Sequence, residues 1–426
     1  MNNTSLPAQQ ALLLTLRTPD LSEQQCMNYL DELESLCTTL GIEPIERLVV
    51  PIKHLHPRYL VGSGKAQELS EIAEDIGVDC IVFDDTISPS QQRNLEQISG
   101  LCVIDRQEVI LEIFSEHART KEALLQVGLA RMEYSLPRLT RAWTHLSRQR
   151  GGTRGTRGEG ETQLEVDRRV VLNKITKLKR ELAKLQSQRT TRRKQRTSIP
   201  VPTGALVGYT NAGKSSLLNT LTGSSAIVED QLFATLDPTT KKMELPGGTK
   251  VLLTDTVGFI RKLPHNLIDA FHSTLEETVV ADILIHILDA SNPEVRQHIK
   301  TTEEVLSELE VNDTPTLLVF NKIDLCKDEL HLAQLRSEYP NALFVSVKEN
   351  SGIDLISQKI EEMLFHSTPQ VLFKFPLSKY DLVAEIHRSG KVIHEEYQDD
   401  SVLIEARVPV KLKYKLAEYT QHFQKA

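Results

Sequence analysis

Cysteine is scarce in this chain of 426 residues, and its five cysteines show neither CxxC spacing nor paired histidines. This scarcity excludes a zinc ribbon and a disulfide scaffold, and it fits a reducing cytoplasm. The sequence also lacks any apolar run near the roughly 18–20 residues that span a membrane. The N-terminal stretch MNNTSLPAQQ lacks the basic-then-apolar order of a signal peptide. We therefore expect a soluble, cytoplasmic protein without a membrane span.

Aromatic residues are also few, at 5% of the chain, whereas hydrophobic residues make up 40% and charged residues 25%. The last two values are ordinary for globular proteins and exclude a largely disordered, collagen-like or purely coiled-coil chain. At roughly 100–200 residues per domain, the length predicts two to four domains.

The net charge of −8 hides an uneven distribution. Residues 138–196 carry 18 Lys and Arg against 5 Asp and Glu, which gives this segment +13 and leaves −21 for the rest of the chain. Such a segment is either a solvated helix face or a surface for a polyanion. Because the charge is confined to one glycine-containing segment, we favour structured RNA as its partner and expect no DNA binding.

The spacing of apolar residues divides the chain into four parts and predicts a multidomain α/β protein. Residues 1–107 alternate apolar runs with helical patterns, which predicts an N-terminal parallel-sheet α/β domain. Residues 108–198 predict a long antiparallel helical hairpin, or coiled coil, with a glycine-rich tip loop at 151–160. Residues 199–366 return to strand–helix alternation, and residues 367–426 predict a small C-terminal α+β domain.

The seam of the expected hairpin lies on two apolar stripes of its second helix. These stripes are Val171, Leu178 and Leu185, which recur every seven residues, and Ile175 and Leu182 between them. The first helix has its own apolar face, formed by Leu125, Leu129, Met132 and Leu136. At about 35–40 residues, each arm would be on the order of 50–60 Å long. The tip would offer phosphate-binding side chains, namely Arg148, Arg150, Arg154 and Arg157.

A phosphate-binding loop opens the third part of the chain. Its motif, G-x-x-x-x-G-K-[ST] between a predicted strand and a predicted helix, consists of Gly208, Tyr209, Thr210, Asn211, Ala212, Gly213, Lys214 and Ser215. In such a loop backbone N–H groups surround the phosphates, the lysine neutralises β- and γ-oxygens, and the serine ligates Mg²⁺. We therefore predict a nucleotide and Mg²⁺ here, with Lys214 in a catalytic role.

Two further motifs select GTP rather than ATP. The first, at the end of a predicted strand, is Asp255, Thr256, Val257 and Gly258, in which Asp255 would hold Mg²⁺ through water and the Gly258 N–H would meet the γ-phosphate. The second is Asn321, Lys322, Ile323 and Asp324. Asp324 can accept two hydrogen bonds from guanine that adenine cannot donate. Asn321 would brace this loop, and Lys322 would pack along the base.

Two more segments complete the predicted site. Between the phosphate loop and Asp255 lie Phe233, Ala234, Thr235, Leu236 and Asp237, where a mobile segment must supply a hydroxyl to Mg²⁺. Thr235 is the candidate, so the predicted metal ligands are Ser215, Thr235 and Asp255. Beyond them, Ser346, Val347 and Lys348 either give the base a last backbone contact or form an ordinary loop.

These motifs resemble the HflX family of GTPases within the Obg-like branch. The resemblance rests on GYTNAGKSSL, FATLDPTTKK, DTVGFI and NKID, on GEGETQLEVDRR at 158–169 and on the N-terminal YLVGSGKAQEL. It implies a P-loop GTPase that binds the large ribosomal subunit and, in some members, splits stalled or idle ribosomes under stress. Nothing in the sequence demands more than a monomer, so we expect a monomer. By this resemblance the basic arm would reach ribosomal RNA. Glu159, Lys242 and Val347 depart from the family pattern.

Two residues of the site bear on catalysis. Phe259 occupies the position after DxxG where Ras-like enzymes carry a water-orienting glutamine, which predicts slow hydrolysis of ~10⁻⁴–10⁻³ s⁻¹ that a partner accelerates. The alternative is that Phe259 is a core residue and the water is held from elsewhere in the chain.

In related GTPases an asparagine at the position of Asn211 accompanies K⁺, so K⁺ is a hypothetical second cation. The alternative is that Asn211 is an ordinary loop residue without a bound ion.

Functions of two other classes are compatible with parts of this pattern. In one, the protein is a GTP-gated RNA- or protein-binding module in which hydrolysis is incidental. The other, a membrane-coupled transport GTPase, requires spanning helices that the sequence lacks. Stimulation of GTP turnover by ribosomes would separate the first alternative from a ribosome-associated enzyme.

Overall fold

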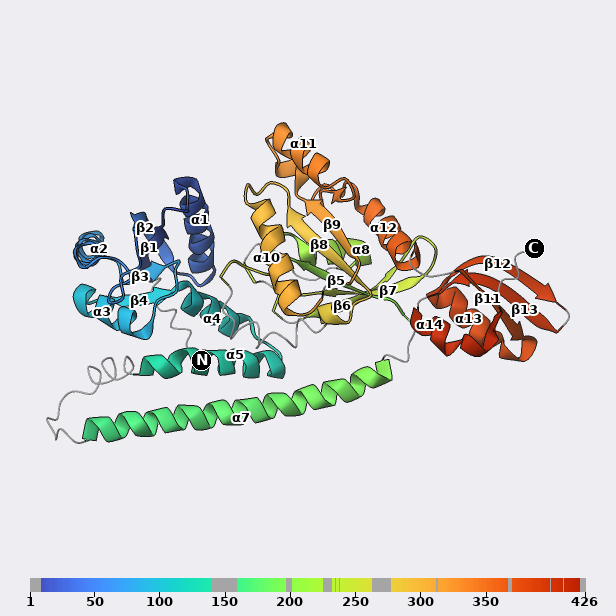
Figure 1. The fold of residues 1–426 in the computed structure, drawn as a ribbon, viewed down its shortest axis with the longest axis horizontal. Coiled ribbons are helices and arrows are strands. Elements are labelled where there is room, and N and C mark those ends of the chain that lie inside the picture. The colour runs from blue at the N-terminus through green and yellow to red at the C-terminus, as the bar shows by residue number, and fades with distance from the viewer. Residues whose placement is uncertain are drawn as a thin grey trace. The chain divides into compact units, whose positions relative to one another are not determined.

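A computed structural model gives the fold of the protein (Figure 1). It describes residues 9–139, 159–196, 201–224, 232–233, 235–236, 238–262, 277–311, 313–366, 370–398, 400–408 and 410–421. The chain forms two compact units, one covering most of the chain up to Leu185 and the other most of the chain from Gln186. Among the described residues, no helix is both long and apolar enough to cross a bilayer.

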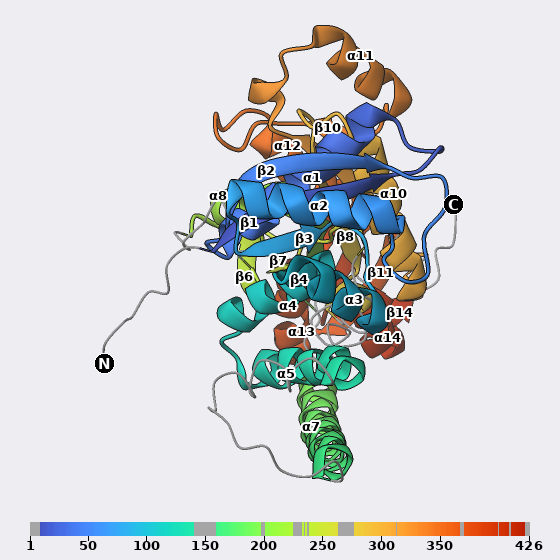
Figure 2. The same cartoon turned by 90° about the vertical axis from the view of Figure 1, so that its left-hand side faces the viewer.

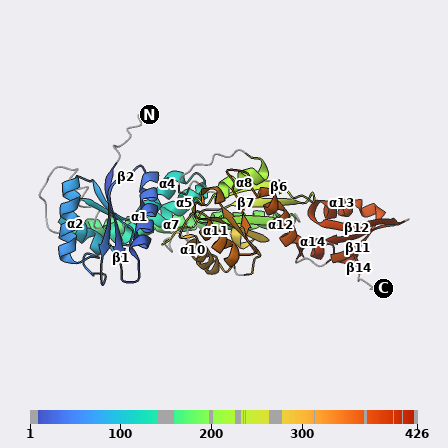
Figure 3. The ribbon, with the colours of Figure 1, turned by 90° about the horizontal axis from the view of Figure 1, so that it is seen from above.

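The first unit begins with the predicted parallel sheet, in the order β2-β1-β3-β4. Its strands are β1 (Gln10–Arg17), β2 (Glu43–Pro51), β3 (Cys80–Phe83) and β4 (Cys102–Asp105). Its helices are α1 (Glu23–Thr39), α2 (Ser63–Ile76), α3 (Pro89–Ser99) and α4 (Arg106–His117). Figure 2 shows α2 and α3 in front of the sheet, and Figure 3 shows α1 on the opposite face.

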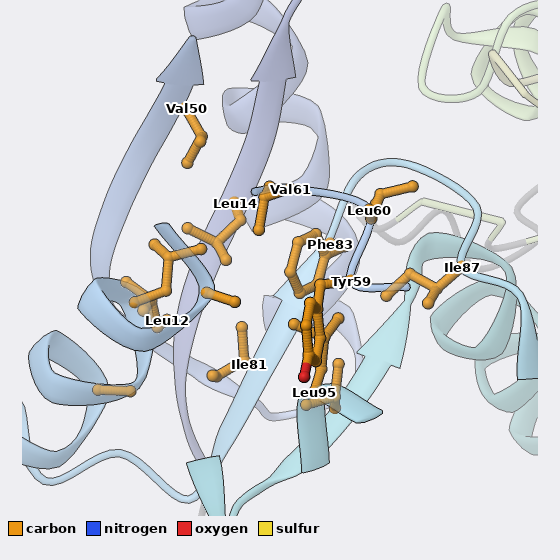
Figure 4. Packing of buried hydrophobic residues seen from close by; sticks show 14 of the residues in the cluster. Leu12, Leu14, Val50, Tyr59, Leu60, Val61, Ile81, Phe83, Ile87 and Leu95 are labelled. Atoms are coloured by element: carbon orange, nitrogen blue, oxygen red, sulfur yellow. The ribbon is translucent and has the colours of Figure 1, made fainter. Parts of the chain in front are cut away.

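Sequence explains why the helices of this domain begin where they do. Ser22 and Ser88 each accept a hydrogen bond from the backbone N–H three residues on, and glutamines at those positions bond back to form capping boxes. The core between the sheet and α2–α3 is made of strand side chains such as Leu12, Leu14 and Phe83, which Figure 4 shows packed together.

A buried ion network ties α4 to this domain. Arg106, only 1% exposed, donates to Asp84 Oδ1 at 2.9 Å and to Glu32 Oε2 at 2.6 Å. Asp84 follows β3 and is fully buried, and Glu32 lies on α1. The helix α4 therefore crosses the predicted boundary after residue 107 and packs as part of the α/β domain.

The predicted first arm of the hairpin is not one long helix. It is divided into α4 and α5 (Lys121–Ser135), which is followed by the 3₁₀ turn η1 (Leu136–Arg138). The break falls at Ala118–Thr120, where Thr120 caps α5 through its side chain. Arg138, the first basic residue of the charged segment, is held by the Ile87 carbonyl at 2.6 Å and is not free for RNA.

The second arm is a single helix, α7 (Glu159–Arg196). Along its described side chains, the predicted seam residues are buried or half-buried: Val171, Ile175, Leu178, Leu182 and Leu185. Contacts of its described residues with α5 include an ion pair and an apolar contact. Lys179 pairs with Glu133 at 2.8 Å, and the Leu178 Cδ1 atom lies 4.0 Å from where a Cβ on Gly128 would be.

The second unit contains a six-stranded sheet in the order β10-β9-β8-β5-β7-β6, parallel except for β6. Its strands are β5 (Thr203–Gly208), β6 (Thr239–Glu244), β7 (Lys250–Asp255), β8 (Ile283–Asp289), β9 (Thr316–Asn321) and β10 (Leu343–Phe344). The helices around it include α8 (Lys214–Thr222), α10 (Val295–Glu308), α11 (Glu329–Glu338) and α12 (Ile353–His366), with the 3₁₀ turn η2 (Ile323–Leu325). Parallel strands bring their carboxyl ends to one edge, where ligands bind in such folds.

The C-terminal module of this unit is an antiparallel sheet with helices on one side. In chain order it comprises β11 (Gln370–Pro376), η3 (Leu377–Lys379), α13 (Tyr380–Ser389), β12 (Lys391–Gln398), β13 (Ser401–Arg407), α14 (Val410–Lys415), η4 (Ala417–Tyr419) and β14 (Thr420–Gln421). Its strand order, β12-β13-β11-β14, together with the βαββαβ sequence is that of the split βαβ motif. The sequence of this module predicts its α+β class and carries no motif that indicates the strand order.

Candidate functional site

The predicted phosphate loop lies between β5 and α8, at the carboxyl edge of the sheet. Two glycines are required there. Gly208 has φ 141°, and a Cβ on it would lie 2.2 Å from the Ile287 carbonyl oxygen; Gly213 has φ 93°, and a Cβ would lie 2.4 Å from Asn321 Nδ2. No other residue fits this backbone without displacing its neighbours.

Lys214 is buried beneath the loop, with 6% of its surface exposed. Its Nζ donates to the carbonyls of Gly208 at 3.2 Å and Tyr209 at 2.7 Å. An ammonium has three hydrogens, so one remains for a phosphate oxygen. Burial lowers the pKa of Lys214 to about 8, and nearby Asp255 partly opposes this shift.

The three predicted metal ligands lie together, because the hydroxyls of Ser215 and Thr235 both bond to one carboxylate oxygen of Asp255. Ser215 Oγ donates to Asp255 Oδ2 at 2.6 Å, Thr235 Oγ1 donates to the same atom at 3.1 Å, and the two hydroxyl oxygens lie 2.8 Å apart. Burial raises the pKa of Asp255, while Lys214 and the hydroxyl donors act in the opposite direction. One carboxylate and two hydroxyls are hard oxygen donors, which fits Mg²⁺.

The predicted base-reading loop is joined to the phosphate loop through Asn321. Its Nδ2 donates to the Ala212 carbonyl at 3.0 Å, and its Oδ1 accepts from the Val347 N–H at 3.0 Å. Ser346 Oγ donates to Asp324 Oδ1 at 2.6 Å. The structure therefore brings Ser346 and Val347, whose sequence signal was weak, into the same loop cluster as Asp324, whereas Lys348 is exposed.

Sequence reasoning missed one residue of this cluster. Asp289, at the end of β8, pairs through Oδ2 with Lys322 Nζ at 2.9 Å. Lys322 has a φ of 62°, so the ion pair holds a side chain that projects from a left-handed backbone position. The available signal was the carboxylate at a strand end, as at Asp255, but no motif distinguishes it.

Comparison with known proteins shows the family. Residues 27–115 match the family described as GTP-binding GTPase N-terminal, residues 117–196 the GTP-binding GTPase middle region, and residues 203–322 the 50S ribosome-binding GTPase. The GTPase HflX of Akkermansia muciniphila is 49% identical over 411 residues, covering 94% of each chain. That of Escherichia coli K12 is 40% identical over 391 residues, covering 91% of this chain and 92% of the other.

The chain belongs to the HflX family of GTPases. Membership confirms the expected activity, the hydrolysis of GTP to GDP and phosphate. Among solved structures, a GTP-binding protein of Sulfolobus solfataricus in complex with GDP is 24% identical, with 83% of this chain and 98% of that chain covered and a TM-score of 0.42.

In this HflX-family site, Phe259 is 2% exposed, as a core residue is. Its backbone N–H donates to the Gly208 carbonyl at 3.0 Å, and its carbonyl accepts from the Thr210 N–H at 2.8 Å. Gly258 lies so close to the phosphate loop that a Cβ on it would be 2.9 Å from Lys214 Nζ. Phe259 is therefore a core residue, as the alternative holds, and its buried ring offers no group that could orient the attacking water.

Some predicted positions lie outside the described residues. In the segment 233–237 these are Ala234 and Asp237, whereas Phe233 and Leu236 are buried and Thr235 is half-buried. On the arm, the four tip arginines also lie outside the described part of the chain. The side chain of Asn211, the hypothetical K⁺ ligand, is exposed at a φ of 56°.

Proposed function

We propose that this HflX-family GTPase binds the large ribosomal subunit in the cytoplasm and uses GTP hydrolysis to separate subunits of stalled or idle ribosomes under stress. The observation that carries the proposal is the surface of α7. Over its described side chains it buries the apolar seam and exposes seven basic residues: Arg168, Arg169, Lys174, Lys177, Lys179, Arg180 and Lys184. A 50S ribosome-binding family description for residues 203–322 supports the same partner.

The site residues have separate roles in this proposal. Lys214 and the backbone of the phosphate loop neutralise and hold the phosphates, and the Gly258 N–H donates to the γ-phosphate. Ser215, Thr235 and Asp255 would hold Mg²⁺, which supplies positive charge to the phosphate oxygens. Thr235 lies on the segment that a γ-phosphate would order. The conformation of this segment would therefore differ between the GTP and GDP states, and a bound partner would respond to that difference. K⁺ at Asn211 is a further proposal, tested by comparing turnover in KCl and NaCl at equal ionic strength.

The decisive experiment measures GTP turnover by the protein alone, with large subunits and with intact ribosomes. We expect a large stimulation by ribosomal particles, because Phe259 supplies no water-orienting group and activated GTPases run up to ~10⁵-fold faster than unassisted ones. Subunit separation is then followed by sucrose-gradient sedimentation. Tight GTP binding without stimulation would contradict the proposal and favour the GTP-gated binding module.

Base selection is tested by Asp324→Asn. The amide reverses one of the two hydrogen bonds to guanine, so affinity for GDP should fall at least ~100-fold while that for xanthosine diphosphate rises. Competition binding of the two nucleotides measures the change. Ser357→Ala, which removes an exposed hydroxyl on α12, is the control and should leave both affinities unchanged. If Asp324→Asn still prefers GDP, Asp324 does not read the base.

A further inference from the structure

Tyr209, a variable position of the phosphate-loop motif, joins three parts of the GTPase domain. Its hydroxyl oxygen accepts a hydrogen bond from the Arg261 backbone N–H at 2.7 Å. Its ring stacks on the ring of His298 in α10, with centroids 3.7 Å apart and planes 5° from parallel. With 6% of its surface exposed, the side chain lies away from solvent.

The partner segment, residues 259–261, follows the DxxG motif directly and is paired with the phosphate loop. In the β5–β7 ladder Leu206 pairs with Asp255, 49 residues further along the chain. Beyond the ladder Tyr209 pairs with Phe259, which is 50 residues further along. The turn through Gly258 therefore contains one extra residue, after which the chain returns to the phosphate loop. Two backbone hydrogen bonds of Phe259 and the Tyr209 hydroxyl hold it there.

This anchoring bears on catalysis because of where Gly258 lies. A Cβ on Gly258 would be 2.8 Å from the Thr210 Cα and 2.9 Å from Lys214 Nζ, so the glycine fits against the loop without spare room. Its N–H is the group expected to donate to the γ-phosphate. The position of that N–H is fixed by the residues on both sides, Asp255 before it and residues 259–261 after it.

We propose that Tyr209 is a positioning residue for GTP hydrolysis, which fixes the segment after DxxG through its hydroxyl and is itself fixed by the His298 ring. It acts through the backbone of residues 258–261 and does not touch the reacting atoms. A residue with this role affects the hydrolysis step more than nucleotide affinity, because the base loop and the phosphate-loop N–H groups that hold GDP do not depend on the hydroxyl. A residue that merely fills space would tolerate loss of the hydroxyl.

The first test is Tyr209→Phe, which keeps the stacked ring and removes the acceptor. We expect the single-turnover rate of GTP hydrolysis to fall roughly 3- to 10-fold, the effect of one hydrogen bond, with GDP affinity changed by less than about twofold. The matched control is Tyr339→Phe, since Tyr339 packs on Phe320 elsewhere in the same domain. It should hydrolyse GTP at the wild-type rate.

The second test addresses the ring contact. His298→Phe keeps an aromatic ring against Tyr209 and should retain most of the hydrolysis rate. His298→Leu removes the aromatic ring and should reduce the hydrolysis rate with little change in GDP affinity. Combining His298→Leu with Tyr209→Phe should cost less than the product of the two single effects, because both act through one anchor. Thermal unfolding shows that each variant is folded.

Two results would overturn the proposal. A Tyr209→Phe rate equal to wild type, or faster, would show that the hydroxyl does not position the segment. An equal loss of GDP affinity and hydrolysis rate in Tyr209→Phe would show that the residue only maintains the phosphate loop.

Discussion

At the scale of single residues, the charge of Lys214 is set by its burial. With its pKa lowered to about 8 in the nucleotide-free protein, the side chain is protonated at neutral pH and loses its charge as pH rises through 8. We therefore expect GDP affinity to be constant below about pH 7 and to fall by about tenfold per pH unit above pH 8. Fluorescent-nucleotide titration between pH 6.5 and 9.5 measures this dependence.

Lys214→Arg is the control for this prediction, because a guanidinium stays protonated throughout the range. Its affinity is expected to be lower but independent of pH. A wild-type affinity that does not change up to pH 9.5 would mean that the Lys214 charge is not lost in the free protein.

The residues of the nucleotide site show which of its parts the sequence could predict. The phosphate loop, Asp255 and Asp324 belong to contiguous motifs whose spacing encodes their geometry. The stack of Tyr209 on His298, the pair of Lys322 with Asp289 and the bond of Ser346 to Asp324 join residues far apart in the chain. No local pattern records such contacts, because they depend on which strands become neighbours in the sheet.

At the scale of secondary-structure elements, the first unit depends on a buried charge that links α1, β3 and α4. Arg106→Met removes the guanidinium that faces the fully buried Asp84 and the half-buried Glu32. Breaking a buried pair in this way should destabilise the domain by about 3–5 kcal/mol. Urea unfolding followed by circular dichroism measures the loss.

The comparison for that prediction is Arg47→Met, which removes a guanidinium whose partners, Asp31 and Glu34, are more exposed. It should cost no more than about 1 kcal/mol. Similar costs for both variants would show that the Arg106 network contributes no more than a surface pair.

The helical elements also show the limits of sequence patterns. The heptad pattern correctly predicted which side of α7 is buried, since Ile175 and Leu182 are 8% and 9% exposed. It gave no sign of the break between α4 and α5, because Ala118–Thr120 contains neither glycine nor proline. There the Thr120 cap and the packing of α4 on the sheet domain outweigh continuous helix propensity.

At the scale of the whole molecule, charge is segregated: residues 138–196 carry +13 in a chain of net −8. If α7 binds ribosomal RNA, replacing Lys174, Lys177 and Arg180 by glutamine should lower affinity for the large subunit. The slope of log affinity against log salt should also flatten by about 2–3, at roughly 0.7–0.9 per lost phosphate contact. Co-sedimentation at several salt concentrations measures both.

A triple variant of exposed lysines outside α7, Lys53, Lys300 and Lys391 to glutamine, removes the same charge from other surfaces. It should leave the salt slope near its wild-type value. An equal change in both variants would indicate that net charge, rather than the α7 surface, governs the association.

The double hydrogen bond of Asn321 has a consequence for how a nucleotide is held. One side chain joins the predicted phosphate loop, at the Ala212 carbonyl, to the predicted base-reading cluster, at the Val347 N–H. If these loops hold the two ends of GDP, as we propose, the nucleotide meets a single preorganised receptor, and capture of either end presents the other at high effective concentration. Guanosine and pyrophosphate offered as separate fragments receive no such advantage, and the affinity of the intact nucleotide depends on this connection as well as on the contacts at each end.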